Sequence, residues 1–327
     1  MAPMSVVVPV FNSEAILPVL VTRIEPVLRT SAHHFELILV NDGSSDGSWR
    51  VICDLAARHD WIHGVNLMRN YGQHNALLCG IRLARYDSLV TIDDDLQHPP
   101  EEIPKLFELL EQGYDVVYGT PVRENHGLLR NAASRLTKLA LQSAMGVDVA
   151  RNVSAFRLMR TGLRDGFADY RGPFVSIDTL LTWATTRFAA VPVRSDRRFS
   201  GNSNYTLRKL LRHALNMMTG FSTVPLQLAS WIGFAFTLVG FGILSYVVGR
   251  FFIQGGSVPG FPFLASTIAL FSGAQLFSLG IIGEYLARMH FRVMDKPPYV
   301  VRSSSVHGTE VGVPAKQDCA TPRGVKT

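Results

Sequence analysis

Two long apolar stretches near the carboxyl end restrict the fold of this chain more than any other feature. Leu226–Gly249 contains no charged side chain, and neither does Phe261–Gly283. Each run is long enough to cross the roughly 30 Å hydrocarbon core of a bilayer as a helix. The link between them, Arg250–Gly260, is short and rich in Gly and Pro. The pattern predicts a membrane hairpin with helices at about 226–249 and 261–286, and it disfavours two buried core helices of a large soluble fold.

Charged residues flank the hairpin unevenly. The net charge of +6 comes largely from basic residues on either side of the two runs, whereas the link has only Arg250 at its edge. By the positive-inside rule, both termini and the preceding domain lie in the cytoplasm, at the inner or plasma membrane. We see no basic stripe interleaved with aromatic residues, so anionic lipids and phosphates are expected as partners rather than nucleic acid. The flanking basic residues are Arg197, Arg198, Arg208, Lys209 and Arg212, then Arg288, Arg292, Lys296 and Arg302.

The first 120 residues alternate between short β-branched runs and helical segments. This alternation predicts an α/β fold with a mainly parallel sheet, in which ligands gather at the carboxyl ends of the strands. The order places Pro9–Phe11, Asn41–Gly43 and Asp93–Asp95 on one rim. The expected strands are Ser5–Val10, Phe35–Val40, Gly64–Leu67, Ser88–Ile92 and Asp115–Tyr118.

Three consecutive carboxylates, Asp93, Asp94 and Asp95, follow the fourth of these strands directly. Like charges side by side repel one another, so the motif favours a bound cation. Carboxylate oxygens suit a hard divalent ion, Mg²⁺ or Mn²⁺, whose remaining ligands are phosphates and water. A solvated acidic turn is the alternative, and the motif taken alone does not exclude it. The loop at Asp42 is rich in Gly and Ser, which suits either hydrogen bonds to a base or ribose or an ordinary turn.

Several segments together resemble a known family. The chain from about residue 4 to 302 is similar to the inverting family 2 glycosyltransferases with the GT-A fold. It is most similar to their polyprenyl-phosphate group, which includes dolichol-phosphate mannose synthase and the two-span bacterial undecaprenyl-phosphate sugar transferases. The segments are Ser5–Asn12, Val40–Asp46, Arg69–Gln73, Asp93–Pro99, Gly280–Arg288 and Lys296–Tyr299.

The resemblance assigns roles on the donor side. Pro9 and Phe11 would flank the base of a nucleotide sugar, and Asp42 would bind the base or ribose. Glu14, Arg69 and Asp93 complete the implied nucleotide-binding set.

The metal and the diphosphate have their own implied residues. Asp93, Asp95 and Gln97 would hold the metal, and Asp94 is expected to face outward. Arg198, in a segment that matches an Arg-x-x-Gly-x-Ser-x-Tyr motif, would clamp the donor diphosphate and join Asp93 and Asp95 as the catalytic set.

On the acceptor side, Arg123, Arg130 and Ser134 are spaced like the residues that bind the lipid phosphate. A solvated basic helix face is the alternative. Where relatives often carry an acidic residue before Phe156, this chain has Ala155. A polyprenyl phosphate is already an oxyanion at neutral pH, so it can attack without a strong base. Asp178 could act as an acid or base by its type alone and is left outside the catalytic set.

The predicted organisation is a GT-A domain over 1–205, an amphipathic interfacial helix over 206–223, the hairpin over 224–290 and a tail that is disordered after about 303. The predicted activity is transfer of one sugar, with inversion, from a nucleotide sugar to polyprenyl phosphate, with UDP-linked donors favoured. The resemblance also implies a homo-tetramer. A processive polysaccharide synthase is one alternative, although the chain lacks its Gln-x-x-Arg-Trp motif; a non-catalytic nucleotide-sugar-binding scaffold is another.

Overall fold

The computed structural model describes residues 2–121, 153–172, 174–196, 224–254, 260–306 and 309–312. They fall into two compact units. The α/β unit holds the described residues up to 196 together with the segment that starts at Lys296. The helical unit holds the two long helices that lie between these segments in the sequence.

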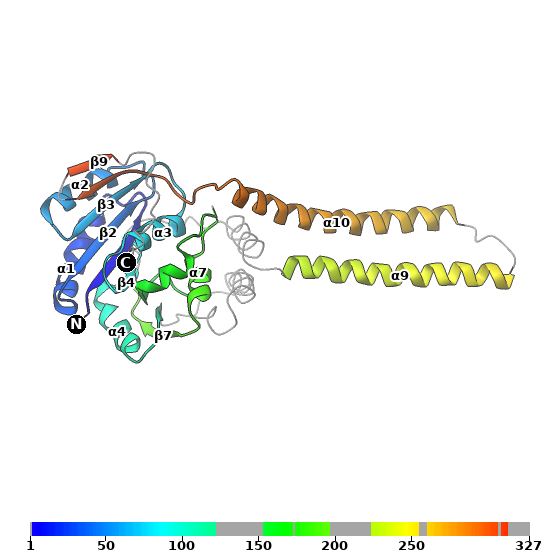
Figure 1. The fold of residues 1–327 in the computed structure, drawn as a ribbon, viewed down its shortest axis with the longest axis horizontal. Coiled ribbons are helices and arrows are strands. Elements are labelled where there is room, and N and C mark those ends of the chain that lie inside the picture. The colour runs from blue at the N-terminus through cyan, green and yellow to red at the C-terminus, as the bar shows by residue number, and fades with distance from the viewer. Residues whose placement is uncertain are drawn as a thin grey trace, which may run out of the picture. The chain divides into compact units, whose positions relative to one another are not determined.

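A mixed sheet forms the centre of the α/β unit (Figure 1). Its strand order is β7-β5-β6-β4-β1-β2-β3-β8-β9, in which β4, β1, β2 and β3 are mutually parallel. Strand β6 runs antiparallel to β4 and β5, and β8 runs antiparallel to β3. The strands are β1 (Met4–Val10), β2 (Phe35–Asn41), β3 (Ile62–Leu67), β4 (Ser88–Thr91), β5 (Val116–Pro121), β6 (Arg157–Arg160), β7 (Phe188–Val193), β8 (Val301–Val306) and β9 (Thr309–Gly312).

Helices cover both faces of the sheet because its central strands are apolar on both sides. On one face, Val6 and Val8 pack with α1 (Leu17–Ser31), α2 (Ser48–Arg58) and α4 (Ile103–Glu111). On the other face, Val7 packs with α3 (Gln73–Leu83), η2 (Thr161–Phe167) and α7 (Ile177–Ala184). A short helix, η1 (Pro100–Glu102), leads into α4. The predicted α/β class with a mainly parallel sheet is confirmed.

The strand order reverses direction at β1. From β1 the chain goes first to β2 and β3 on one side and then to β4 on the other. At such a switch point the loops leave the carboxyl ends of neighbouring strands in opposite directions, which opens a crevice for ligands. The rim predicted from the sequence therefore lies where β1, β2 and β4 end.

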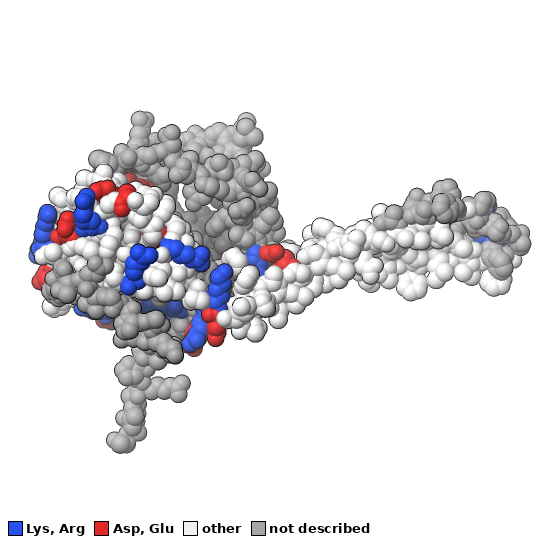
Figure 2. Space-filling view, turned by 90° about the horizontal axis from the view of Figure 1, so that it is seen from above, with Lys and Arg blue, Asp and Glu red and all other residues white. Residues whose placement is uncertain are grey.

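The described part of the helical unit contains α9 (Val224–Gln254) and α10 (Phe261–Val293), which pack side by side (Figure 1). Candidate spans of 27 and 22 residues lie within them, at Val224–Arg250 and Leu270–Phe291. Large apolar side chains such as Trp231, 70% exposed, cover their outer surface, which is nearly free of charge in Figure 2. Apolar surface of that extent is typical of contact with lipid. The two predicted apolar helices are confirmed.

The segment after the second helix differs from the prediction. Disorder after about residue 303 is wrong for Ser303–Val306 and Thr309–Gly312, which form most of β8 and all of β9. Strand β8 pairs with β3 and so satisfies backbone groups that an exposed edge would leave open. Ser303 and Ser305 are buried in it. The polar composition of this segment concealed a strand that is stabilised by pairing.

Candidate active site

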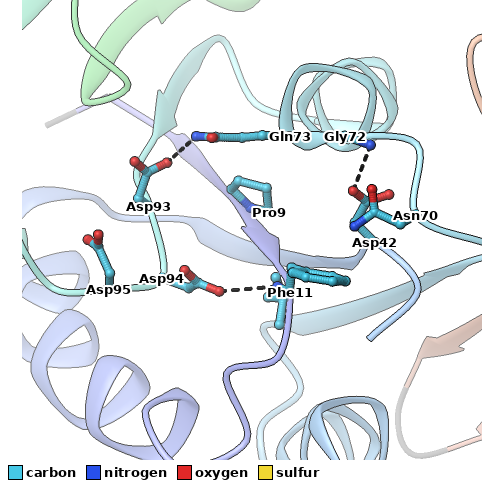
Figure 3. Close-up of a pocket in the computed structure, with 10 residues that line it drawn as sticks. Pro9, Phe11, Asp42, Asn70, Gly72, Gln73, Asp93, Asp94 and Asp95 are labelled. Atoms are coloured by element: carbon cyan, nitrogen blue, oxygen red, sulfur yellow. Dashed lines mark hydrogen bonds between the residues drawn. The ribbon is translucent and has the colours of Figure 1, made fainter. Parts of the chain in front are cut away.

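A pocket opens at the carboxyl ends of β1, β2 and β4, at the switch point of the sheet (Figure 3). Its walls come from the loops after β1, β2 and β4, which are far apart in the sequence, and the loop at 70–72 with the start of α3 closes it on one side. The sequence-based prediction that these loops share one rim is confirmed. The lining residues are Pro9, Val10, Phe11, Asp42, Asn70, Gly72, Gln73, Asp93, Asp94 and Asp95.

The end of β1 supplies an apolar surface. Pro9 is the second-last residue of the strand, and Phe11 follows it with 49% of its surface exposed. Asn12 has a φ of 55°, so the chain turns sharply immediately after Phe11. An exposed aromatic ring beside polar groups is suited to stack on a flat heterocycle such as a nucleobase.

Asp42, at the end of β2, orders the opposite wall. Its carboxylate accepts hydrogen bonds from the main-chain N–H groups of Tyr71 (2.7 Å) and Gly72 (2.8 Å). Burial raises the pKa of Asp42, although the two donated hydrogen bonds lower it in part. Next to it, Gly43 has a φ of +65°, and a Cβ there would lie 2.5 Å from the carbonyl carbon of Arg69. The two loops can pack this closely only because residue 43 is Gly.

The acidic loop after β4 brings Asp93 and Asp95 to the same pocket (Figure 3). Asp93 accepts a hydrogen bond from Nε2 of Gln73, at the start of α3. Asp95 accepts one of 3.0 Å from the main-chain N–H of Gln97, and Leu96 between them has a φ of 58°. The loop is therefore a tight turn that presents two carboxylates from alternate positions.

Asp94 was predicted to face outward, but it faces the pocket. It lines the pocket and accepts hydrogen bonds from the main-chain N–H of Phe11 (3.3 Å) and from Oγ of Ser13. Burial raises the pKa of Asp94, partly offset by the hydrogen bonds from Ser13 and Phe11. The outward orientation predicted for Asp94 is wrong because Phe11 and Ser13, 83 and 81 positions earlier in the chain, provide donors for its carboxylate.

Three other predicted residues lie away from the pocket lining. Glu14 accepts a hydrogen bond from the N–H of Gly47 (3.0 Å) and pairs with Arg50 (3.1 Å), so its carboxylate faces the start of α2. The guanidinium of Arg69 lies over the ring of Tyr71, 4.7 Å from its centroid. Gln97 is outside the lining set, and its carbonyl accepts a hydrogen bond from the N–H of Asp196 (2.9 Å).

Asp178 has partners that the sequence did not indicate. It is 4% exposed, pairs with the buried Arg157 and accepts a 3.1 Å hydrogen bond from the hydroxyl of Tyr118. Burial first, and then the Asp178 charge, raise the pKa of Tyr118 well above its ordinary value. The carboxylate is thus held inside the unit by a cation and a hydroxyl, an arrangement that supports a structural role for Asp178.

Four predicted site residues, Arg123, Arg130, Ser134 and Arg198, lie outside the described residues, as does the predicted interfacial helix at 206–223. Within the described ranges, no group of three or more His, Cys, Asp or Glu side chains could hold a metal by itself. Asp93 and Asp95 contribute two carboxylates. A cation there would need further ligands from an amide, phosphates or water, as Mg²⁺ commonly does.

The fold and the pocket define an α/β protein with an acidic loop at the switch point of its sheet. Residues 5–167 match the model of glycosyl transferase family 2, and the chain belongs to that family. It is a glycosyltransferase that carries two apolar helices in addition to its α/β unit.

Similar proteins agree with the predicted group. An undecaprenyl-phosphate 4-deoxy-4-formamido-L-arabinose transferase from Pseudomonas syringae is 35% identical over 94% of this chain and 93% of its own length. A protein of that name from Aeromonas hydrophila is 35% identical over 92% and 94%. Among solved structures, glucosyl-3-phosphoglycerate synthase from Mycobacterium tuberculosis is 20% identical over 67% of this chain and 78% of its own, with a TM-score of 0.48. The resemblance to the polyprenyl-phosphate group is confirmed by the first two.

Proposed function

We propose that this enzyme transfers a single sugar from a nucleotide sugar to polyprenyl phosphate, with inversion at the anomeric carbon. The observation that carries the proposal is the pocket in which Phe11, Asp42 and the acidic loop meet. The relatives, 35% identical over nearly their whole length, support the acceptor because their names specify undecaprenyl phosphate. The product would be a lipid-linked sugar for modification of a cell-envelope glycan or lipid.

For the donor we favour a UDP-linked sugar, as the resemblance to two-span bacterial transferases implies. The sugar named in the relatives is a modified pentose, 4-deoxy-4-formamido-L-arabinose. A pentose of this kind is the first donor to test, followed by glucose and N-acetylglucosamine. GDP-mannose serves as the comparison with another base.

The base would lie against Phe11 and Pro9, with the loop ordered by Asp42 opposite. Asp93 and Asp95, with Gln97 beside them, fit a hard divalent ion because all three offer oxygen ligands. A bound Mg²⁺ or Mn²⁺ would supply positive charge near the donor diphosphate. Arg198 would serve the same diphosphate, since a guanidinium can pair with two phosphate oxygens at once.

The acceptor phosphate would approach from the face of the sugar opposite the diphosphate. Arg123, Arg130 and Ser134 would hold it there. One of its oxygens attacks the anomeric carbon while the bond to the diphosphate breaks. Because that oxygen carries negative charge at neutral pH, the reaction does not need a carboxylate at Ala155.

The two apolar helices would keep the enzyme beside a lipid that stays in the bilayer. By the distribution of basic residues, the α/β unit and both termini would face the cytoplasm in a multi-pass arrangement. Labelling of single cysteines introduced on either side of the helices, in intact cells and in inverted vesicles, tests this. The homo-tetramer implied by the resemblance stays a prediction, which light scattering in detergent would check.

The decisive experiment uses the full chain in vesicles with undecaprenyl phosphate, divalent metal and radiolabelled nucleotide sugars. A labelled lipid carrying one sugar is the expected product. Asp95→Ala should not form it, whereas Asp54→Ala, an exposed substitution on α2, should. Extended polymer would favour a processive synthase. Nucleotide binding without transfer for every donor would favour a non-catalytic scaffold.

A further inference from the structure

The hydrogen-bond ladder of β1 ends beside the acidic loop. Strand β1 stays paired with β2 up to Val10. On its other edge, the carbonyl of Val7 accepts a hydrogen bond from the N–H of Ile92, just after β4. Phe11 follows the last paired residue. Its N–H is satisfied by the side chain of Asp94, at 3.3 Å. A side chain from the acidic loop thus continues the hydrogen bonding where the strand ladder stops.

One oxygen atom of Asp94 accepts two hydrogen bonds. The same carboxylate oxygen, Oδ2, accepts from both the N–H of Phe11 and the hydroxyl of Ser13. Both donors belong to the turn that carries the exposed Phe11 ring into the pocket (Figure 3). Asp94 therefore fixes that turn at two points from the side of the acidic loop.

The other side of the turn is held independently. The N–H of Asn12 donates to Oγ of Ser44 (3.0 Å), and the N–H of Ser13 donates to Oγ of Ser48 (2.8 Å). Oδ1 of Asn12 accepts from the N–H of Ser45 (2.8 Å). These bonds connect the turn to the start of α2, so loss of Asp94 would release one side of it while the other remains attached.

We propose that Asp94 is a positioning residue for the nucleoside of the donor: it acts through Phe11 and Ser13 to hold the ring against which the base stacks. The inference rests on the proposed function, because it takes the pocket to be the donor site. It gives the middle carboxylate a task distinct from that of Asp93 and Asp95. Because Asp94 lies between them, the acidic loop that faces the diphosphate also sets the platform for the base.

Binding of nucleoside monophosphates to the full chain without metal tests this directly. Calorimetry in a chelating buffer with uridine, guanosine, cytidine and adenosine 5′-monophosphates measures base recognition apart from the diphosphate. For whichever nucleotide binds, Asp94→Ala should weaken affinity by about tenfold, which is less than the full contribution of two hydrogen bonds because the turn stays attached to the start of α2. Asp94→Asn retains an acceptor oxygen of the same shape and should bind within about twofold of wild type. Ser13→Ala should have a smaller effect, and adding it to Asp94→Ala should cost little more.

Steady-state transfer provides the second readout. Asp94→Ala should raise the KM for the donor and change kcat little, whereas substitution of a residue that binds the metal would lower kcat. Equal affinity of Asp94→Ala and wild type would overturn the inference. A loss in Asp94→Asn as large as in Asp94→Ala would also overturn it, because the charge rather than the geometry would then matter. Failure of wild type to bind any of the four nucleotides would instead reject the donor pocket, and with it the proposed function. Asp54→Ala is the matched control and should behave as wild type.

Discussion

The carboxylate of Asp42 accepts a 2.8 Å hydrogen bond from the main-chain N–H of Gly72, thirty residues later in the chain. Together with the bond from Tyr71, it fixes one wall of the pocket to the end of β2. Asp42 lines the pocket as the sequence predicted, but both of its carboxylate oxygens also accept hydrogen bonds from the main chain. Any contribution that Asp42 makes to donor binding would therefore depend also on the order of the loop at 70–72.

Asp42→Ala should therefore affect stability and binding together. Two part-buried N–H groups, of Tyr71 and Gly72, would lose their acceptor, at an expected cost of about 1–3 kcal/mol in the free energy of unfolding. Chemical unfolding of the α/β unit, monitored by its Trp fluorescence, measures the first effect and calorimetry with a nucleotide the second. Asp42→Asn, which can accept only one of the two bonds well, should lie between wild type and Asp42→Ala. Normal stability with lost binding would show that the carboxylate serves the ligand alone.

Removal of divalent metal should stop transfer. A chelator is expected to lower the rate by about 10²-fold or more, because charge developing on the diphosphate loses its main compensation. Adding Mg²⁺ or Mn²⁺ should restore the transfer rate of wild type but not that of Asp95→Ala. Transfer that is insensitive to the chelator at every donor concentration would contradict the assignment of Asp93 and Asp95. Nucleoside monophosphate binding should persist throughout, which shows that the pocket remains intact.

Asp178→Ala should destabilise the α/β unit strongly. It would leave the buried guanidinium of Arg157 without its carboxylate, which typically costs about 3–5 kcal/mol. Denaturant unfolding measures the loss. Replacing both partners, with Arg157→Met and Asp178→Leu, should recover much of it since no lone charge is then buried. A stable Asp178→Ala that has lost transfer would instead indicate a direct role in the reaction.

Acid should weaken the junction between the first turn and α2 through Asp46. Burial alone would raise the pKa of Asp46, but hydrogen bonds from Ser48 and the N–H of Glu14 outweigh it and lower the pKa. A lowered pKa means that the folded state favours the ionised form. The stabilisation is therefore present above the unfolded-state pKa and is lost as pH falls through the folded-state pKa.

Asp46→Asn tests this with unfolding measured at pH 7 and in steps below pH 4. The variant should be less stable than wild type at pH 7, and the gap should close as the pH falls. A constant gap across the series would rule out Asp46 as the group responsible. Asp54→Asn, exposed on α2, is the control and should follow wild type.

Much of the fold could be predicted because it follows from local pattern. Apolar strands that alternate with helices define a parallel sheet, and the carboxyl ends of its strands must share a rim. Pro9, Phe11, Asp42, Asp93 and Asp95 all line the pocket for this reason. Their individual roles follow from the family resemblance and stay proposals.

Other features depend on contacts that local pattern does not encode. Ser13 and Asp94 are 81 residues apart, and nothing in either segment indicates that one hydroxyl will meet one carboxylate. Glu14 follows a predicted nucleotide-binding motif in sequence, yet its two carboxylate oxygens accept hydrogen bonds from Gly47 and Arg50. The structural role of Asp178 is visible only from its ion pair with Arg157, which the sequence does not indicate.

The pairing of β8 with β3 has a topological consequence for the membrane. Residues 301–306 belong to the same sheet as the first strand of the chain, although α9 and α10 lie between them in sequence. A sheet cannot be divided by a bilayer, so the chain must come back to the side from which it left. If the chain between β7 and β8 crosses a membrane, it must therefore cross it an even number of times. The parity follows from strand pairing alone, independently of where basic residues fall.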